Sequence, residues 1–523
     1  MASGRGSGPG GGGSGLGLSS GFVRQEDTIA VGRCTGRYAG AGTVDEAHSF
    51  DLVVIGSGPA GEKGAAQAAY FGKRVAIVER EAVFGGAAAN TGTLPSKTLR
   101  ETSLTLSGFR NRGLYGVDLS LRRQATVPDL MRRAGAIMAT ERERIRANLD
   151  RHRIATFRGE GSFVDPHTVR ATPRGKPPVD LRAEIVLIAT GSSPRRTPLF
   201  PFGHPLVFDS DEILKIDRLP RTLAVVGGGV IGAEYASTFA ALEIEVSLIE
   251  GRDRLLQFLD GEIAEALRKG MQHLGIRFYM PKRVVSCEAG AESVTLRLDG
   301  GESVTAEAVL VSAGRVSNTA TLDLAAAGIR CGEHGLIPVD EHFRTSAPNV
   351  YAAGDVIGFP ALASTSMEQA RLAMVHAFDL RYKKALAPVL PYGIYTIPEV
   401  SMAGETEESL TAKGIDYVVG RAAYQQNARG QIIGDREGML KLLFERRGLR
   451  LLGVHVLGEQ ATELVHVGLT ALLAGAGADL FIQTCYNYPT LAETYKYATY
   501  DAMGKRDAAD LLSREDPWPG CRT

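Results

Sequence analysis

Short apolar runs alternate with glycine turns and helix-like stretches from residue 49 onward. Phe50–Ile55 is an apolar run, and the glycine turn Gly56–Gly61 (GSGPAG) follows it directly. A helix-like stretch, Glu62–Tyr70, and a second apolar run, Arg74–Glu79, come next, and the second run ends in a carboxylate. Short apolar runs bounded by glycine are typical of buried parallel strands. The order therefore predicts a strand, a glycine turn, a helix and a second strand.

A second unit of the same kind begins near residue 223. Leu223–Val226 leads into Gly227–Gly232 (GGGVIG), a helix is expected from Ala233, and Glu243–Glu250 is a strand that again ends in a carboxylate. In such units the glycines let the backbone approach a pyrophosphate at the helix N-terminus, and the acid holds a ribose hydroxyl. One fingerprint of this kind is a weak signal. Two with equal glycine-to-acid spacing predict two bound dinucleotides, usually a flavin and a nicotinamide, and hence an oxidoreductase.

Two further apolar runs end in small residues. Ile185–Thr190 stops at Gly191, just before the second unit, and Asn349–Ala353 stops at Gly354 and Asp355. Each pattern alone is more often the core of an α/β fold than a ligand site. Their order around the two fingerprints makes them candidate ligand contacts.

The composition fits a soluble globular protein of two or three domains. The chain has 523 residues, 44% of them hydrophobic and 23% charged, with a formal net charge of +0. A neutral chain lacks the basic face that nucleic acid or an anionic membrane requires, and no apolar run is long enough to span a bilayer. The five cysteines and ten histidines show no metal-ligand spacing. An odd number of widely separated cysteines indicates a reducing compartment, so we expect a cytoplasmic protein without a metal site.

The order of the motifs resembles that of the two-dinucleotide flavoprotein disulfide reductases. The resemblance covers roughly residues 49–505 and rests on both fingerprints together with Ala189-Thr-Gly191, Gly314-Arg315 and Gly354-Asp355-Val356. It implies an α/β fold with two Rossmann-like dinucleotide-binding domains, one for FAD and one for NAD(P), and a C-terminal α+β domain that forms a homodimer. The expected boundaries are 1–48 for a Gly/Ser-rich flexible tail, 49–197 and 316–388 for the FAD domain, 198–315 for the NAD(P) domain, 389–506 for the dimerisation domain and 507–523 for a second tail.

The resemblance also assigns roles to individual residues. Asp355 is expected on the ribityl chain of FAD, and Lys97 is expected near the flavin N5, paired with Glu234. A buried salt bridge without a redox role is the alternative for this pair. The further residues expected to bind FAD or the nicotinamide nucleotide come from the glycine turns, the strand ends and the segments that follow them; they are Gly56, Gly58, Pro59, Ala60, Gly61, Glu79, Arg80, Gly86, Ala87, Thr91, Gly161, Thr190, Gly191, Gly227, Gly229, Gly232, Glu250, Arg252, Arg254, Gly314 and Gly354.

The stretch Phe84–Arg100 (FGGAAANTGTLPSKTLR) has the frame of a redox-active disulfide loop but contains no cysteine. By the resemblance, the two redox cysteines should stand at Ala88 and Thr93. The catalytic motif near the C-terminus is changed as well, because Tyr488 stands where the family has a histidine, five residues before Glu493. A phenol does not accept a thiol proton near neutral pH as an imidazole does. Disulfide reduction is therefore excluded, and we expect the segment with Tyr488 and Glu493 to close the flavin site of a second subunit.

Three functions remain open. Without a disulfide, a hydride can pass directly between a nicotinamide and the flavin, and the first hypothesis is transhydrogenation between NADPH and NAD. The runs Thr91–Lys97, Arg252–Leu256 and Tyr392–Glu399, and the Tyr488-Pro-Thr segment, are similar to the transhydrogenase branch of the family. That branch usually keeps the first cysteine, whereas Gly85–Ala88 is similar to members that reduce quinones. The second hypothesis is therefore an NAD(P)H-dependent quinone or dye reductase, and the third is a non-catalytic flavin-binding scaffold.

The turn after the second unit bears on the choice of nicotinamide. Glu250 favours NAD, because a carboxylate accepts hydrogen bonds from the ribose hydroxyls and repels a 2′-phosphate. Arg252 and Arg254 favour NADP, because a guanidinium can hold that phosphate with two parallel hydrogen bonds. Both arginines could instead be solvated charges of a loop. A turn with all three groups would accept both nucleotides as substrates, as a transhydrogenase requires.

Overall fold

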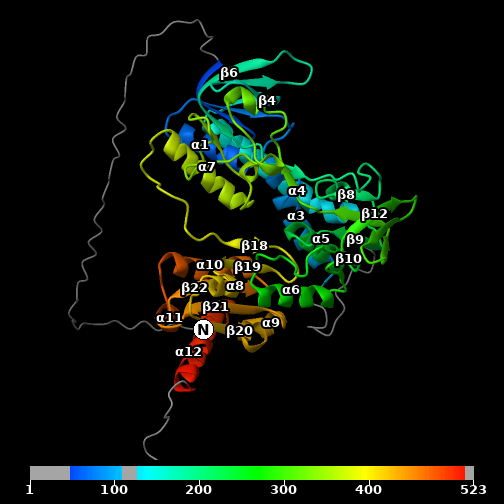
Figure 1. Ribbon diagram of the computed structural model, residues 1–523, viewed down its shortest axis with the longest axis vertical. Coiled ribbons are helices and arrows are strands. Elements are labelled where there is room, and N and C mark those ends of the chain that lie inside the picture. The colour runs from blue at the N-terminus through cyan, green and yellow to red at the C-terminus, as the bar shows by residue number, and fades with distance from the viewer. Residues whose placement is uncertain (1–47, 109–125, 513–523) are drawn as a thin grey trace, which may run out of the picture. The chain divides into compact units, whose positions relative to one another are not determined.

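The first part of the fold is a seven-stranded sheet built from two separate segments of the chain (Figure 1). A computed structural model describes residues 48–108 and 126–512. The sheet has the order β3-β2-β1-β6-β5-β4, and β17 also pairs with β6. Its β3-β2-β1-β6 section and the β6–β17 pair are parallel, whereas β4, β5 and β6 form antiparallel pairs. The strands are β1 (Ser49–Ile55), β2 (Val75–Glu79), β3 (Ala155–Arg158), β4 (Glu160–Asp165), β5 (Thr168–Thr172), β6 (Val179–Ile188) and β17 (Val350–Ala352).

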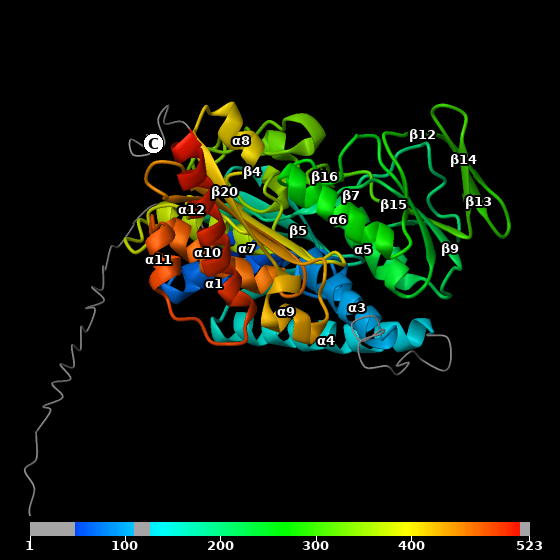
Figure 2. The same cartoon turned by 90° about the horizontal axis from the view of Figure 1, so that it is seen from below.

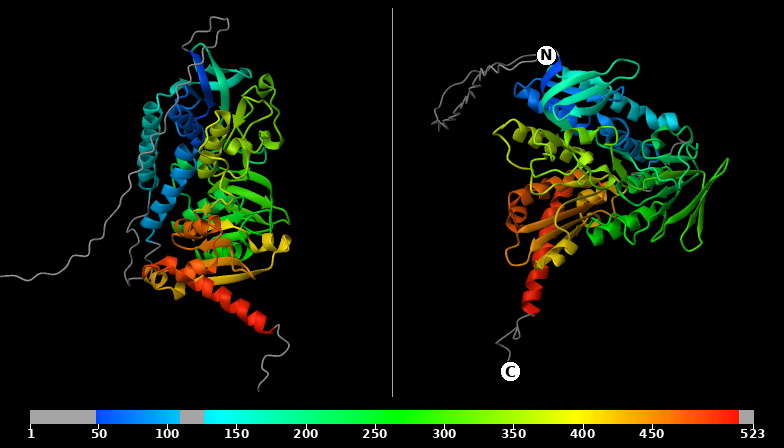
Figure 3. Two further views of the ribbon diagram at one scale, coloured as in Figure 1. Left: turned by 90° about the vertical axis from the view of Figure 1, so that its left-hand side faces the viewer. Right: turned by 45° about the horizontal axis from the view of Figure 1, so that its top comes forward.

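Strand β1 is apolar on both faces because both faces are covered. Leu52 and Val54 pack in a cluster with residues of α1 (Pro59–Tyr70) and α7 (Ala363–Ala377), and these two helices lie against each other (Figure 1). Val53 and Ile55 point the opposite way and pack in a second cluster. The remaining helices of this part are α2 (Gly86–Asn90), α3 (Thr93–Leu106) and α4 (Val127–Arg151), with α3 packed against α4 (Figure 3).

The second part is a five-stranded parallel sheet of the order β11-β10-β9-β15-β8. A short antiparallel ladder, β7 with β16, lies where the chain enters and leaves this part, so the second sheet is an insertion into the first. A separate antiparallel sheet of the order β12-β13-β14 belongs to the same insertion. The elements are β7 (Ser192–Pro194), β8 (Val207–Asp209), β9 (Thr222–Val226), α5 (Val230–Ala241), β10 (Glu245–Ile249), α6 (Gly261–His273), β11 (Arg277–Tyr279), β12 (Val284–Ala289), β13 (Val294–Leu298), β14 (Ser303–Ala306), β15 (Ala308–Val311) and β16 (Arg315–Ser317).

The third part is an antiparallel sheet of the order β18-β19-β22-β21-β20, with helices packed against it. Helix α12 packs against β20 and β21 (Figure 2). This helix continues past residue 506, so the second tail expected from residue 507 is wrong as far as Leu512. The elements are β18 (Tyr392–Ile394), β19 (Val400–Gly404), α8 (Glu407–Ala412), β20 (Tyr417–Ala423), α9 (Ala428–Ile433), β21 (Met439–Glu445), β22 (Leu451–Leu457), α10 (Ala461–Leu473), α11 (Ala478–Gln483) and α12 (Thr494–Leu512).

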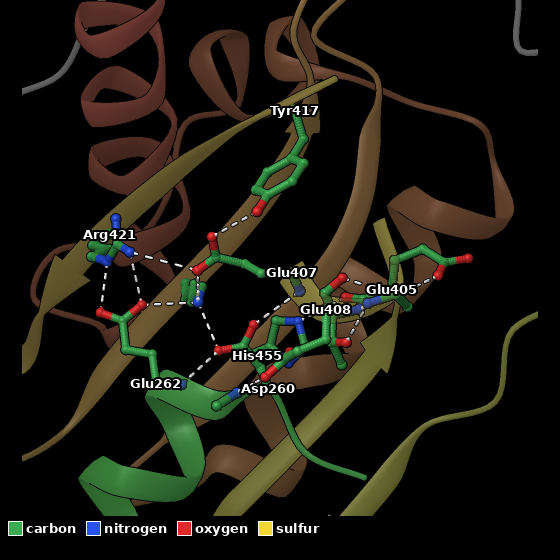
Figure 4. Close-up of polar contacts among 12 residues, drawn as sticks. Asp260, Glu262, Glu405, Glu407, Glu408, Tyr417, Arg421 and His455 are labelled. Atoms are coloured by element: carbon green, nitrogen blue, oxygen red, sulfur yellow. Dashed lines mark hydrogen bonds and ion pairs between the residues drawn. The ribbon is translucent and has the colours of Figure 1, made fainter. Parts of the chain in front are cut away.

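A cluster of charged side chains joins the second and third parts, and we call it the Lys441 cluster. The fully buried ammonium of Lys441 lies 2.6 Å from Asp260 Oδ1 and 2.8 Å from Glu262 Oε2, and it also contacts Glu407. Arg421 donates two hydrogen bonds to Glu262, of 2.7 and 2.8 Å (Figure 4). Burial lowers the pKa of Lys441, but its bonds to the three carboxylates outweigh this and raise it. Carboxylates in this arrangement could hold a metal ion; here the lysine ammonium lies among them.

The elements predicted around both glycine turns are present, and the α/β fold class is confirmed. Helix α1 begins at Pro59 rather than Glu62, because proline is favoured in the first turn of a helix. Part of the expected loop over Phe84–Arg100 forms α2. The expected flexible tail over residues 1–48 lies, apart from His48, outside the described residues. Within the described ranges, no helix is both long and apolar enough for a membrane span.

Candidate active site

The first glycine turn leaves open space at its middle glycine and is tightly packed on either side of it. A Cβ atom on Gly56, which has φ +101°, would lie 2.4 Å from Ala189 O, and one on Gly61 would lie 2.0 Å from Gly56 O. A Cβ on Gly58 would approach no atom closer than Gly86 Cα, at 3.9 Å. Gly56 and Gly61 therefore allow α1 to pack on the turn, while Gly58 faces the space in which a pyrophosphate would lie.

The acid at the end of β2 is held in place by the same turn. Glu79 is buried, and its Oε2 accepts hydrogen bonds from Ser57 N (2.9 Å) and Ser57 Oγ (2.5 Å). Glu79 Oε1 accepts a third hydrogen bond, from Glu81 N (2.8 Å). The carboxylate is therefore fixed in orientation before any ligand arrives, as a ribose acceptor should be.

The second glycine turn repeats this geometry. A Cβ on Gly232 would lie 1.9 Å from Gly227 O, whereas one on Gly229 would have no atom within 4 Å. Glu250 at the end of β10 accepts hydrogen bonds from Gly228 N (2.6 Å) and Arg252 N (2.9 Å). The two turns thus present the same pair of features, an open middle glycine and a fixed carboxylate.

Both turns open onto one cavity of about 1620 Å³. The cavity is lined by residues of all three parts of the fold, including Tyr392 and Tyr395 of the third part. Five of the predicted site residues do not line it: Gly61, Gly232, Arg254, Tyr488 and Glu493. The predicted site residues that do line it are Gly56, Gly58, Pro59, Ala60, Glu79, Arg80, Gly86, Ala87, Thr91, Lys97, Gly161, Thr190, Gly191, Gly227, Gly229, Glu234, Glu250, Arg252, Gly314, Gly354 and Asp355.

Polar groups in the cavity wall fit the ribityl chain and ribose of FAD. Thr190 Oγ1 is buried and has no hydrogen-bond partner among the described residues. A buried hydroxyl without a partner costs about 1–3 kcal/mol, so a polar ligand atom would be stabilised there. Asp355 Oδ2 accepts a hydrogen bond from Ser192 Oγ (2.8 Å), and Asp355 lines the cavity. The donor set and the open space at Gly58 fit the group that the sequence predicted.

The predicted pairing of Lys97 with Glu234 is present. Lys97 Nζ on α3 lies 2.5 Å from Glu234 Oε2 on α5, and the exposed fractions of the two side chains are 25% and 8%. Glu234 Oε1 also accepts a hydrogen bond from Tyr395 N (2.9 Å). One carboxylate of the second part therefore contacts both the first and the third part, and it leaves the lysine partly open to the cavity.

The cavity wall contains no thiol among the described residues. Ala88 and Thr93, the positions expected for redox cysteines, both line it. The described cysteines are Cys287, Cys331 and Cys485, and none of these three does. The cavity wall therefore offers a flavin no cysteine from the described residues.

Arg254 does not line the cavity. Its Nη1 lies 2.6 Å from Glu408 Oε1 on α8, and its Nη2 donates a hydrogen bond to Gln257 O (2.8 Å). Arg254 was expected to act with Arg252 on a nucleotide; in the structure only Arg252 lines the cavity, and a carboxylate of the third part binds the guanidinium of Arg254. Its sequence position after Glu250 gave no sign of this partner.

The segment with Tyr488 and Glu493 also lies outside the cavity of its own chain. Tyr488 is 76% exposed, and Glu493 Oε2 accepts a hydrogen bond from Thr490 N (3.4 Å). Exposed aromatic side chains are typical of contact surfaces. The expectation that this segment closes the site of a second subunit stays a prediction.

Several cavity residues were not singled out from the sequence. Ser57 and Ser192 orient Glu79 and Asp355 through hydrogen bonds. Asp211 also lines the cavity, and burial raises its pKa, an effect that the charge of Arg315 partly offsets. Ser57 lies inside the first glycine turn and Ser192 lies directly after Gly191, so their places beside predicted site residues were a weak indication that they line the cavity. Other cavity residues that sequence reasoning missed include Phe258, Lys282, Arg283, Phe359, Tyr392 and Tyr395.

Comparison with known proteins places this geometry in a family. Residues 50–374 match the model of the pyridine nucleotide-disulphide oxidoreductases, and residues 390–499 match the dimerisation domain of the same proteins. The chain belongs to this family. A family member from Mycobacterium tuberculosis, named soluble pyridine nucleotide transhydrogenase, is 44% identical over 466 residues, which is 89% of this chain and 99% of the relative. A protein of the same name from Pseudomonas putida is 40% identical over 88% of this chain and 99% of its own length.

Solved structures of the pyridine nucleotide-disulphide oxidoreductase fold are similar over most of the chain. LpdA from Mycobacterium tuberculosis has a TM-score of 0.79 at 27% identity, over 86% of this chain and 99% of LpdA. The HOCl-induced flavoprotein disulfide reductase RclA from Escherichia coli has a TM-score of 0.77 at 25% identity, over 85% of this chain and 98% of RclA. The likeness therefore includes all three parts of the fold.

Proposed function

We propose that this protein is a FAD-dependent transhydrogenase that passes a hydride between NADPH and NAD. The observation that carries the proposal is the shared cavity. Both glycine turns and the Lys97–Glu234 pair open onto it, while Ala88 and Thr93 line it where redox cysteines were expected. The relatives named soluble pyridine nucleotide transhydrogenase, each spanned almost completely by this chain, support the same activity.

The first glycine turn would hold FAD. Gly58 leaves space for the pyrophosphate at the N-terminus of α1, and Glu79 is already oriented to accept hydrogen bonds from a ribose. Thr190 and Asp355 offer polar atoms to the ribityl chain. When bound, the flavin ring supplies a group that accepts and returns a hydride at N5 without any protein nucleophile.

Lys97 would stabilise negative charge on the reduced flavin. Its ammonium lies beside the cavity, and Glu234 balances its charge at 2.5 Å. A fixed cation in a partly buried site stabilises a developing negative charge more strongly than water does, because it need not reorganise. Tyr395 N donates a hydrogen bond to Glu234, which holds the carboxylate, and through it Lys97, in position.

The second glycine turn would bind the two nicotinamide nucleotides one after the other. Gly229 leaves space for the pyrophosphate, and Glu250 is fixed to accept hydrogen bonds from the ribose. Arg252 lines the same cavity and can attract a 2′-phosphate. The site therefore carries groups suited to NADH and to NADPH, and one site can serve both halves of the reaction.

We further propose that the protein is a homodimer. The match of residues 390–499 to a dimerisation domain supports this. So does the exposure of Tyr488, together with that of Tyr497 (56%) and Tyr500 (48%) on α12. Exposed aromatic side chains at this density are more common at interfaces than on the rest of a protein surface.

Stopped-flow reoxidation tests the proposed reaction. The flavoprotein is reduced with NADPH and then mixed in parallel with NAD, with a quinone and with oxygen. We expect NAD to reoxidise the flavin. In the Lys97→Met variant we expect NADPH to reduce the flavin at least 10-fold more slowly, because the cation that stabilises negative charge on the reduced flavin is lost. Reoxidation by the quinone and not by NAD would refute transhydrogenation and establish a quinone reductase.

A further inference from the structure

We propose that Arg283, together with Arg252, recognises the 2′-phosphate of NADP, and that Arg254 instead anchors the nucleotide turn to the third part of the fold. The proposal rests on the function proposed above, because it names the residues by which the second glycine turn accepts NADPH as well as NADH. Arg283 lies 31 positions beyond Arg252 in the sequence, so spacing alone could not pair them.

The backbone fixes Arg283 beside the nucleotide turn. Glu250 N donates a hydrogen bond to Tyr279 O (3.0 Å), and Lys282 N donates one to Glu250 O (2.8 Å). These two bonds hold the connection from β11 to β12 against the turn. A Cβ on Gly251 would lie 3.1 Å from both Cγ and Nε of Arg283, so the side chain of Arg283 lies directly across Gly251. The absence of a side chain at Gly251 leaves room for this arrangement.

The charges around the turn are arranged for an incoming anion. Arg252 and Arg283 are both exposed and both line the cavity. Within the part of the chain that the structure describes, neither guanidinium forms an ion pair, whereas the neighbouring Lys282 pairs with Glu302 at 3.2 Å. The carboxylate of Glu250 is turned toward the backbone N–H groups of Gly228 and Arg252. A phosphate beside Gly251 would therefore meet two guanidinium groups, each able to donate parallel hydrogen bonds.

Arg254, unlike Arg252 and Arg283, is already paired with a carboxylate. Glu408 Oε1 accepts hydrogen bonds from Arg254 Nη1 (2.6 Å) and from Gly261 N (2.9 Å). Glu408 therefore holds both ends of the segment from residue 254 to residue 261, which continues the nucleotide turn. The pKa of Glu408 is lowered: burial acts to raise it, but hydrogen bonds, including that of Arg254, outweigh this effect. Arg254 is thus a positioning residue, and its charge is already neutralised.

The test compares two small ligands that differ only by the phosphate in question. Binding of 2′,5′-ADP and of 5′-AMP to the purified flavoprotein is measured by titration calorimetry, for the wild-type protein and for Arg283→Gln, Arg283→Lys and Arg254→Gln. These ligands carry no nicotinamide, so the measurement is independent of hydride transfer. Failure of the proposed function would appear in the stopped-flow experiment and not here.

We expect Arg283→Gln to weaken 2′,5′-ADP binding about 10- to 100-fold, because one charge-assisted contact is lost. Binding of 5′-AMP should change less than about 3-fold, and Arg283→Lys should recover part of the loss because it restores the charge. Arg254→Gln should change both ligands by the same small factor. Equal losses of both ligands in Arg283→Gln, or a loss confined to 2′,5′-ADP in Arg254→Gln, would overturn the proposal.

Discussion

Removal of the ammonium at the centre of the Lys441 cluster should destabilise the protein strongly. In the Lys441→Met variant, Asp260, Glu262 and Glu407 keep their charges but lose the cation among them. Breaking a buried ion pair by removing one partner costs about 3–5 kcal/mol. We expect the lower end, about 3 kcal/mol, because Arg421 still binds Glu262 and because Glu407 is partly exposed.

The destabilisation caused by Lys441→Met should be larger at alkaline pH than at acid pH. In the wild-type protein the pKa values of Asp260 and Glu262 are lowered. Burial acts to raise both, but His455 on β22 together with Lys441 outweighs this effect for Asp260, and Arg421 together with Lys441 does so for Glu262. A lowered carboxyl pKa contributes stability that is present above the unfolded-state pKa and is lost as the pH falls through the folded-state value. Without Lys441 this contribution largely disappears, and burial favours the protonated acids. The loss of unfolding free energy in Lys441→Met, relative to the wild-type protein, should therefore be largest near about pH 8 and smaller near about pH 5.

Urea unfolding followed by circular dichroism measures both effects. Lys505→Met is the matched control, because Lys505 pairs with Asp501 at 2.5 Å but is 45% exposed, and such surface pairs contribute about 0–1 kcal/mol. A loss below about 1 kcal/mol in Lys441→Met, a loss equal to that of the control, or a deficit that grows toward acid pH would each refute the reasoning.

Three further predictions concern the site. Gly58→Leu should give a folded but colourless protein, whereas Gly229→Leu should keep its flavin but not be reduced by NADH or NADPH. The reason is that each leucine would fill the space left for one pyrophosphate. Absorbance spectra distinguish the two variants, and a normal flavin content in Gly58→Leu would contradict the assignment. Alkylation with iodoacetamide should leave turnover unchanged, and lipoamide and glutathione disulfide should not be reduced, because no described cysteine lines the cavity. Measurable disulfide reduction would show that Ala88 and Thr93 were misinterpreted. Tyr488→Asp should weaken dimerisation and activity together in sedimentation and rate measurements, and a fully active monomer would rule out a shared site.

The sequence predicted the fold well where local rules decide it. The two glycine turns and their strands follow from short motifs with a recurring backbone geometry, whereas the Lys97–Glu234 pair was expected from the family resemblance. The sequence did not predict the ion pair of Arg254 in the nucleotide turn, because its partner Glu408 is more than 150 positions away along the chain. Tertiary contacts of this kind carry no local signal, and the same holds for the position of Arg283 beside Gly251.

The bonds of Glu234 limit how the protein can be rebuilt by recombination. Its carboxylate comes from the inserted sheet, yet it neutralises a lysine of the first part and accepts a backbone bond from the third. An inserted segment taken from another flavoenzyme would have to bring a carboxylate to the same point, or leave Lys97 without its counter-charge. An exchange of any one part therefore has to preserve the contacts of this carboxylate, whereas side chains elsewhere around the cavity can change without disturbing them.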